Sequence, residues 1–115
     1  MDSISKMVDP KHYTYRVIWS KEDNEFVGLC AKFPSMSHLD ETQGAALEGI
    51  TSLVADIVSE MQSTGEVPPT PIADREYSGR FQVRITPELH RRLAVRAAEA
   101  NVSLNRIVSD QLAKP

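Results

Sequence analysis

Three polar side chains with strong hydrogen-bonding capacity alternate along residues 80–85 of this chain. Arg80, Gln82 and Arg84 are separated by single apolar residues, and in a β-strand this alternation places all three on one face. Arginine donates a pair of hydrogen bonds to guanine, and glutamine pairs similarly with adenine, at base edges in the DNA major groove. The spacing therefore predicts direct base contacts from one strand face. An ordinary exposed strand would alternate in the same way. The residues that follow the strand favour base contacts over this alternative.

The residues after this strand predict two short helices. Thr86 supplies an N-cap hydroxyl, and Pro87 is the preferred first helical residue. Asn101 suits a left-handed helix end, and Ser103 caps a second helix two residues later. Because the unpaired N–H groups at a helix start attract anions, we expect phosphate contacts at Ser103 and Asn105. A plain helix cap is the simpler alternative, and both can hold together.

One strand and two short helices bury too little surface to be stable alone. A second copy completes such a unit, because the two strands pair into a ribbon that fits the DNA major groove. The apolar faces then form the shared core of a homodimer. The residues predicted for these faces are Phe81, Val83 and Ile85 on the strand, Leu89, Leu93 and Ala97 on the first helix, and Leu104, Ile107, Val108 and Leu112 on the second.

The N-terminal part predicts a small antiparallel sheet and one long helix. Residues 13–20 and 25–33 alternate around a short polar turn, which is typical of a hairpin, and residues 35–40 are a candidate third strand. Thr42 caps a helix that Gly65 ends. The apolar positions on the two strands are Tyr13, Tyr15, Val17 and Trp19, then Val27, Leu29, Ala31 and Phe33. Those on the helix follow a spacing of three and four: Leu47, Ile50, Leu53, Val54, Ile57, Val58 and Met61.

Charge and composition divide the chain into two modules. Residues 1–75 hold 6 Lys/Arg and 12 Asp/Glu, a formal charge of −6, whereas residues 76–115 hold 7 and 4, a charge of +3. A basic module suits a polyanion and an acidic one suits a basic protein, although two ordinary solvated surfaces would give the same split. Residues 65–79 are proline-rich and predict a linker between a first domain, residues 12–64, and a second, residues 80–113.

Catalytic and metal-binding patterns are sparse. The three histidines lie far apart, no glycine-rich phosphate loop occurs, and the single cysteine, Cys30, excludes an intrachain disulfide and a zinc cluster. Carboxylates gather at residues 22–25 and 40–41, so a metal-dependent enzyme is one alternative. Solvated carboxylates are also common at turns and helix starts. We expect no enzyme activity, no metal and no cofactor.

The chain has the composition of a folded, water-soluble protein, with 41% hydrophobic and 25% charged residues. No apolar run approaches the roughly eighteen residues of a membrane span. The first twelve residues, MDSISKMVDPKH, lack the apolar segment of a signal peptide. We therefore expect a cytoplasmic protein without membrane contact.

Residues 78–112 resemble the ribbon-helix-helix fold of Arc- and MetJ-like repressors, and most closely the C-terminal half of HicB-family antitoxins. This resemblance rests on Pro87-Glu88-Leu89-His90 and Val102-Ser103-Leu104-Asn105. The N-terminal half is similar to the same family at Tyr13–Trp19, Phe26–Leu29, Phe33–Ser35, Ser37–Leu39 and Ala45–Leu47.

The resemblance implies an α+β chain with a partial RNase H-like domain followed by a ribbon-helix-helix dimerisation domain. It implies an antitoxin, dimeric or tetrameric, that masks a small basic HicA-like mRNA interferase and represses its own operon by binding operator DNA. Base contacts then fall on Arg80, Gln82 and Arg84, and phosphate contacts near Ser103 and Asn105. The first predicted strand lacks the central acidic metal ligand of a working RNase H, which agrees with an inactive domain. An orphan ribbon-helix-helix regulator without a toxin is the alternative.

Overall fold

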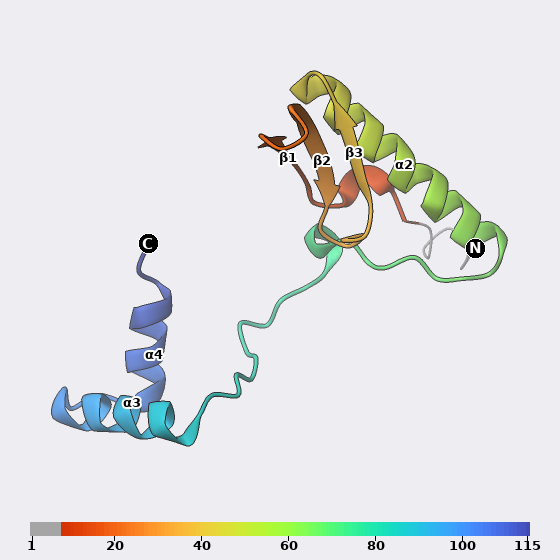
Figure 1. The fold of residues 1–115 in the computed structure, drawn as a ribbon. Helices are drawn as coiled ribbons and strands as arrows, with labels where there is room; N and C mark the ends of the chain where they lie inside the picture. The colour runs from red at the N-terminus through yellow and green to blue at the C-terminus, as the bar shows by residue number, and fades with distance from the viewer. Residues whose placement is uncertain (1–7) are drawn as a thin grey trace. The chain divides into compact units, whose positions relative to one another are not determined.

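The structure is a computed structural model that describes residues 8–115. The first seven residues, part of the stretch on which the cytoplasmic expectation rests, lie outside the described residues. The chain is α+β and divides into two compact units, unit 1 ending at Tyr77 and unit 2 beginning at Ser78. The elements in order are η1 (Pro10–His12), β1 (Tyr15–Ser20), β2 (Glu25–Cys30), β3 (Ser37–Asp40), α2 (Gln43–Ser63), η2 (Ile72–Asp74), α3 (Pro87–Glu99) and α4 (Leu104–Leu112), as Figure 1 shows.

The sheet of unit 1 is antiparallel with strand order β1-β2-β3. β1 and β2 form the predicted hairpin, and β3 pairs with the free edge of β2. The second strand ends at Cys30, so Ala31 and Phe33 lie beyond the strand that was expected to contain them. Because residues opposite each other on an antiparallel ladder lie on the same side, the registers fix which side chains share each face.

The face of β2 that meets α2 differs from the predicted apolar face. Gly28 and Cys30 are buried against the helix, while Val27 and Leu29 lie on the opposite face. A β-carbon on Gly28 would lie 2.5 Å from a backbone oxygen of α2 and 2.8 Å from Ile50 Cγ2. The missing side chain is thus what lets helix and strand approach closely, and hydrophobicity alone could not identify this face.

The long helix α2 is capped at both ends as the sequence predicts. Thr42 Oγ1 accepts a hydrogen bond from the Ala45 N–H at 3.1 Å. At the other end Gly65 has a φ of 84°, and the Glu66 N–H donates to the Met61 carbonyl at 2.8 Å, a Schellman arrangement. The side chains that α2 buries recur every four residues: Ala46, Ile50, Val54 and Val58.

The core of unit 1 lies between α2 and the sheet. Burial of one large aliphatic side chain stabilises a fold by about 1.5–3 kcal/mol, so this cluster accounts for much of the stability of the unit. Leu47, predicted on the buried face, is instead exposed on the flank of the helix. The buried cluster is Tyr13, Cys30, Ile50, Val54 and Val58, surrounded by Val8, Tyr15, Phe33, Met36 and Leu53.

Most of the segment predicted as a linker, residues 65–79, packs on unit 1. Two of its three prolines are buried. The Tyr13 hydroxyl donates to the Pro69 carbonyl at 2.6 Å, and His12 Nδ1 lies 2.9 Å from Asp74 Oδ2. These bonds hold the proline-rich chain against the end of the domain, a role that composition does not reveal.

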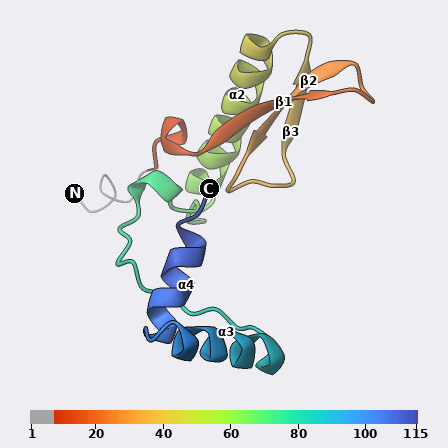
Figure 2. The ribbon, with the colours of Figure 1, turned by 90° about the vertical axis from the view of Figure 1, so that its left-hand side faces the viewer.

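In unit 2, α3 and α4 pack against each other (Figure 2). The predicted N-caps are present, because Thr86 Oγ1 accepts from the Leu89 N–H at 3.2 Å and Ser103 Oγ accepts from the Arg106 N–H at 3.0 Å. Asn101 has a φ of 56°, in the left-handed region expected for a helix end. Local sequence therefore specifies both helices.

Candidate functional site

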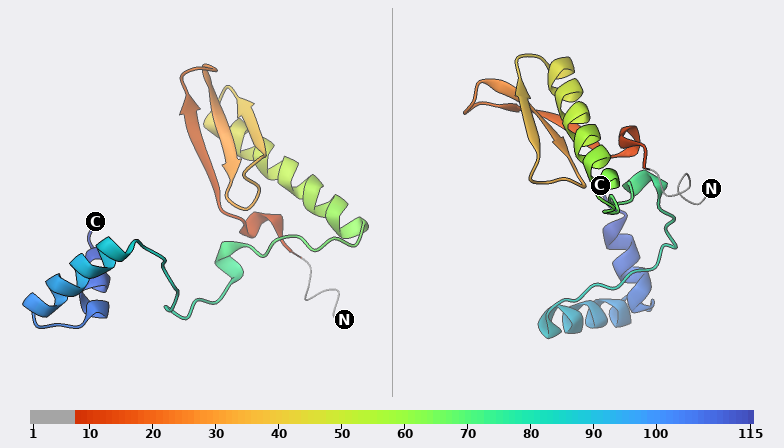
Figure 3. Two further views of the ribbon diagram at one scale, coloured as in Figure 1. Left: turned by 60° about the horizontal axis from the view of Figure 1, so that its bottom comes forward. Right: turned by 90° about the vertical axis from the view of Figure 1, so that its right-hand side faces the viewer.

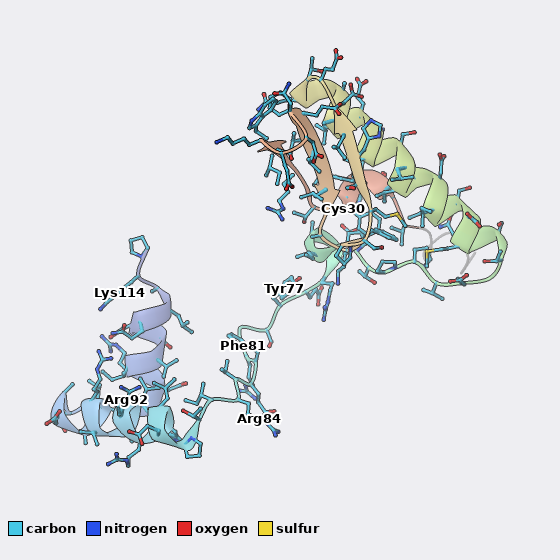
Figure 4. All side chains as sticks on the ribbon, viewed as in Figure 1. Cys30, Tyr77, Phe81, Arg84, Arg92 and Lys114 are labelled. Carbon is cyan, nitrogen blue, oxygen red and sulfur yellow. The ribbon has the colours of Figure 1, made fainter. Side chains whose placement is uncertain are left out.

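The segment 80–85 has no regular secondary structure in the single chain, so the strand predicted there is absent. A strand needs a neighbour to take its backbone hydrogen bonds, and unit 2 supplies none. The side chains of Phe81 and Arg84 stand out from the segment that precedes α3 (Figure 4). Phe81 is 73% exposed and Val83 is 65% exposed. Such exposure is unusual for two large apolar side chains at alternate positions of one segment.

The apolar side chains of this segment line an open groove of about 800 Å³ in unit 2. Leu112 and Ser109 also line it, and no sequence signal marked Ser109, since serine is common on solvated helix faces. Leu89 and Ile107, both predicted core residues, are half-buried outside the lining. The predicted core residues that the structure brings together around the groove are Phe81, Val83, Ile85, Leu93, Leu104, Val108 and Leu112.

Unit 2 has very little core of its own. Ala97 is its one buried hydrophobic residue, and the other apolar side chains of α3 and α4 are half-buried or exposed. A unit this small with so little buried surface is marginal in isolation. The groove is therefore a surface that needs covering.

The polar residues of the same segment are free to meet a ligand. Arg80, Gln82 and Arg84 are exposed. Among residues 8–115, neither arginine lies within ion-pair distance of a carboxylate. The ion pairs of unit 2 lie within α3 and within α4. Unit 2 as a whole holds 7 Lys/Arg and 3 Asp/Glu, a formal charge of +4. Its electrostatics favour a polyanion.

The start of α4 presents backbone donors. Ser103 Oγ caps the Arg106 N–H, whereas the N–H groups of Leu104 and Asn105 have no acceptor in the described part of the chain, as is usual in a first helical turn. Asn105 also lines the groove, beside Leu104 and Val108. The two predicted phosphate contacts thus lie next to the predicted dimer core.

Unit 1 contains an acidic stretch that motif searching does not reveal. Residues 33–74 hold 7 Asp/Glu and no Lys or Arg. Glu48, Asp56 and Glu60 are exposed on α2. The signal in the sequence is the absence of compensating bases over a long stretch, rather than any spacing of the acids.

His38 and Asp40 form a polar pair on the sheet face that meets α2. His38 Nε2 lies 3.1 Å from Asp40 Oδ2, and the Glu41 N–H donates to Asp40 Oδ1 at 2.9 Å. The hydrogen bond from Glu41, followed by that from His38, lowers the pKa of Asp40 below its ordinary value. The His38 ring packs over Gly49, where a β-carbon would collide with it. Within residues 8–115 no three His, Cys, Asp or Glu side chains gather so that they could hold a metal ion.

Comparison with known proteins places a family resemblance on the C-terminal part of the chain. Residues 65–112 match the model for the HicB family. This region contains all of unit 2 as far as the end of α4, together with part of the proline-rich segment that packs on unit 1. No curated protein and no solved structure matches the chain. None of the helices in the described residues has the length and apolar character to cross a membrane. Over residues 65–112 the chain is therefore similar to the HicB family.

Proposed function

We propose that this chain is the antitoxin of a HicA/HicB-type toxin–antitoxin system, acting in the cytoplasm. In this role it neutralises a small basic mRNA interferase through unit 1 and represses its own operon through unit 2. The observation that carries the proposal is the segment 80–85, whose apolar residues line an uncovered groove while its arginines and glutamine are exposed. The HicB-family match over residues 65–112 supports the same assignment.

Pairing of two copies of unit 2 accounts for the groove. When the 80–85 segments of two chains lie antiparallel, each supplies the backbone partners that the other lacks, and a two-stranded ribbon forms. Phe81 and Val83 then lose their exposure to water, which stabilises the pair by about 1.5–3 kcal/mol for each side chain that becomes fully buried. The product is a ribbon-helix-helix dimer.

The opposite face of that ribbon is suited to DNA. Arg80, Gln82 and Arg84 project from it, and arginine and glutamine are the side chains that pair with guanine and adenine in the major groove. Ser103 is the N-cap of α4 and Asn105 lies in its first turn, where backbone N–H groups and side chains suit contacts with the flanking phosphates. We assign base contacts to the first three residues and phosphate contacts to the last two.

Unit 1 is suited to a basic protein. Its α2 helix contains no Lys or Arg, and the stretch around it is uniformly acidic, so a basic toxin would be steered toward it. We assign unit 1 to a partial RNase H-like domain, and its three antiparallel strands followed by one helix across the sheet support this assignment. The role needs no catalysis, and we propose that the chain is not an enzyme.

Binding to DNA upstream of the gene tests the repressor half of the proposal. Replacing Arg84→Ala should weaken binding by about 1–3 kcal/mol, the contribution of one bidentate base contact, in a fluorescence-anisotropy titration at fixed salt. Arg75→Ala removes the same type of side chain from unit 1 and should leave the affinity unchanged. Equal affinities for wild type and Arg84→Ala would overturn the base-contact assignment.

Co-purification with the product of the adjacent gene tests the antitoxin half. A short basic protein should co-elute with the wild-type chain, and the double variant Glu48→Lys, Asp56→Lys should release it. Glu99→Lys, on α3 in unit 2, should retain the complex. If no basic neighbour binds while the upstream DNA still does, the chain is an orphan regulator instead.

A further inference from the structure

The sheet of unit 1 has one face that no helix or strand among residues 8–77 covers. α2 contacts all three strands from one side, and the views in Figure 3 show no element of the unit on the other side. The registers Ile18↔Val27 and Val27↔Leu39 place three apolar side chains in one row across this open face. Leu29 lies beside the row on β2.

An apolar row is unexpected on a sheet face that meets water. Antiparallel sheets with one covered face normally alternate, with apolar residues on the covered side and polar residues on the other. Here Ile18 is 44% exposed and Leu39 is 37% exposed, and the two lie on opposite edge strands, so the row spans the sheet. A contiguous exposed apolar patch of this kind marks an interaction surface.

Two charges of opposite sign flank the apolar row on the same face. Arg16 pairs with Leu29 on one side of the row, and Glu25 pairs with Ser20 on the other. Neither charged side chain lies in an ion pair within the part of the chain that the structure describes. The open face thus carries one positive end, an apolar middle and one negative end.

This distribution of charge decides between two kinds of occupant. A basic protein would find no net attraction on a face with one arginine and one glutamate, because the acidic side chains Glu48, Asp56 and Glu60 belong to α2, on the other side of the sheet. A second copy of the same face fits better. A two-fold axis along the apolar row reverses the two ends, so that Arg16 of one copy lies over the partner's negative end.

We propose that the open face of the β1-β2-β3 sheet is a homotypic interface, on which unit 1 of a second chain packs sheet against sheet. The rows Ile18–Val27–Leu39 of the two copies form the middle of the contact. Arg16 of each copy pairs with Glu25 of the other. In the reversed copy β1 lies opposite β1, so Arg16 faces the partner's Ser20, and Glu25 lies beside that serine on the neighbouring strand. The interface is independent of the groove in unit 2. If both interfaces form, each chain is held by two contacts, and the assembly is a tetramer.

Charge reversal with rescue tests this arrangement. The masses of full-length wild type, Arg16→Glu, Glu25→Arg and the double variant are measured by light scattering after size-exclusion chromatography, with circular dichroism to establish that each is folded. Each single reversal places like charges opposite each other and should halve the mass of the assembly. The double reversal restores opposite charges and should restore the mass. Leu39→Thr, which introduces a β-branched residue compatible with a strand but shortens the apolar row, should also halve it.

The unit 2 groove is separated from this test by a variant of its own. Val83→Asp should halve the mass if unit 2 pairs, whether or not the sheet face does. If unit 2 does not pair, wild type is a dimer and Arg16→Glu is a monomer, and the sheet interface still stands. Arg75→Glu, a reversal away from the face, should leave the mass unchanged. If the single variants are folded and keep the wild-type mass, the proposal is overturned, and residues 1–7 or a protein partner remain as candidates to cover the sheet face. If the double variant fails to regain the wild-type mass, the Arg16–Glu25 pairing is overturned.

Discussion

Gly28 is the residue on which the close packing of unit 1 depends most directly. Any side chain there would meet backbone of α2 and Ile50 at less than van der Waals distance. Gly28→Ala should therefore destabilise unit 1 by about 1–3 kcal/mol, the usual cost of overpacking a core. Urea unfolding followed by fluorescence measures this unit specifically, because Trp19 on β1 is the one tryptophan of the chain.

Gly44 provides the matched control for that substitution. It lies in the first turn of α2, and a β-carbon there would meet nothing within 4 Å. Gly44→Ala should leave stability unchanged or raise it by up to about 1 kcal/mol, since alanine favours helix more than glycine does. Equal unfolding midpoints for Gly28→Ala and Gly44→Ala would show that α2 does not need to approach the strand so closely.

His12 and Asp74 give unit 1 a titratable contact with its proline-rich segment. The hydrogen bond with Asp74, and then its charge, raise the pKa of His12 above 6.5. A raised folded-state pKa means that the pair stabilises the fold below pH 6.5 and that this contribution is lost as the pH rises through the folded pKa. The segment should thus be held most firmly at mildly acidic pH.

An NMR titration of the His12 ring protons checks this assignment. In Asp74→Asn the pKa of His12 should fall back toward 6.5. Asp9→Asn removes the more distant carboxylate, 3.6 Å from His12 Nε2, and should lower the pKa less. A His12 pKa that is the same in wild type and Asp74→Asn would contradict the pairing.

Among the elements, the turn between α3 and α4 is set by one residue with a left-handed backbone. Asn101 has a φ of 56°, and the following N–H, of Val102, donates to the Ala97 carbonyl at 3.0 Å. Alanine is disfavoured there by about 1–2 kcal/mol, whereas glycine is tolerated. Hydrogen exchange should be faster throughout α3 and α4 in Asn101→Ala but near wild type in Asn101→Gly, with α2 unaffected in both. Equal exchange in the two variants would contradict this role for Asn101.

The elements that sequence predicted are those specified by local interactions. The caps at Thr42, Thr86 and Ser103 and the helix ends at Gly65 and Asn101 each depend on residues within a few positions of one another. Side-chain hydroxyls, proline and left-handed residues act over that range. The sequence therefore predicts α2 in unit 1 and both α3 and α4 in unit 2.

The features that sequence did not predict depend on contacts between distant residues. Both faces of β2 are apolar, so periodicity could not show that Gly28 rather than Val27 meets α2. The proline-rich segment is held by Tyr13 and His12, more than fifty positions earlier in the chain. Leu47 fits the helical spacing but lies on an exposed flank. For the segment 80–85, the alternation is clear, yet the strand needs a partner that a single chain lacks.

At the scale of the whole molecule, the two units carry opposite charge. Unit 1, through Tyr77, holds 6 Lys/Arg and 13 Asp/Glu, whereas unit 2 holds 7 and 3. Opposite charges favour different partners, a basic protein for the acidic unit and a nucleic acid for the basic one. We propose that the acidic α2 meets the toxin, that the open sheet face meets a second copy, and that the groove of unit 2 is covered when the DNA-binding ribbon forms.

The central claim is that residues 80–85 become a strand only when two chains pair. Hydrogen exchange followed by mass spectrometry on the peptide that contains them tests this directly, at protein concentrations above and below the pairing transition. The backbone amides should be protected at high concentration and exchange freely on dilution, because the hydrogen bonds of the ribbon exist only between chains.

Two variants complete that measurement. Val83→Asp should abolish the protection at every concentration, while Val67→Asp, the same change at an exposed position of unit 1, should leave it as in wild type. The account predicts protection that depends on concentration and on Val83. Free exchange of residues 80–85 in the wild-type protein at all concentrations, or protection that survives Val83→Asp, would contradict it.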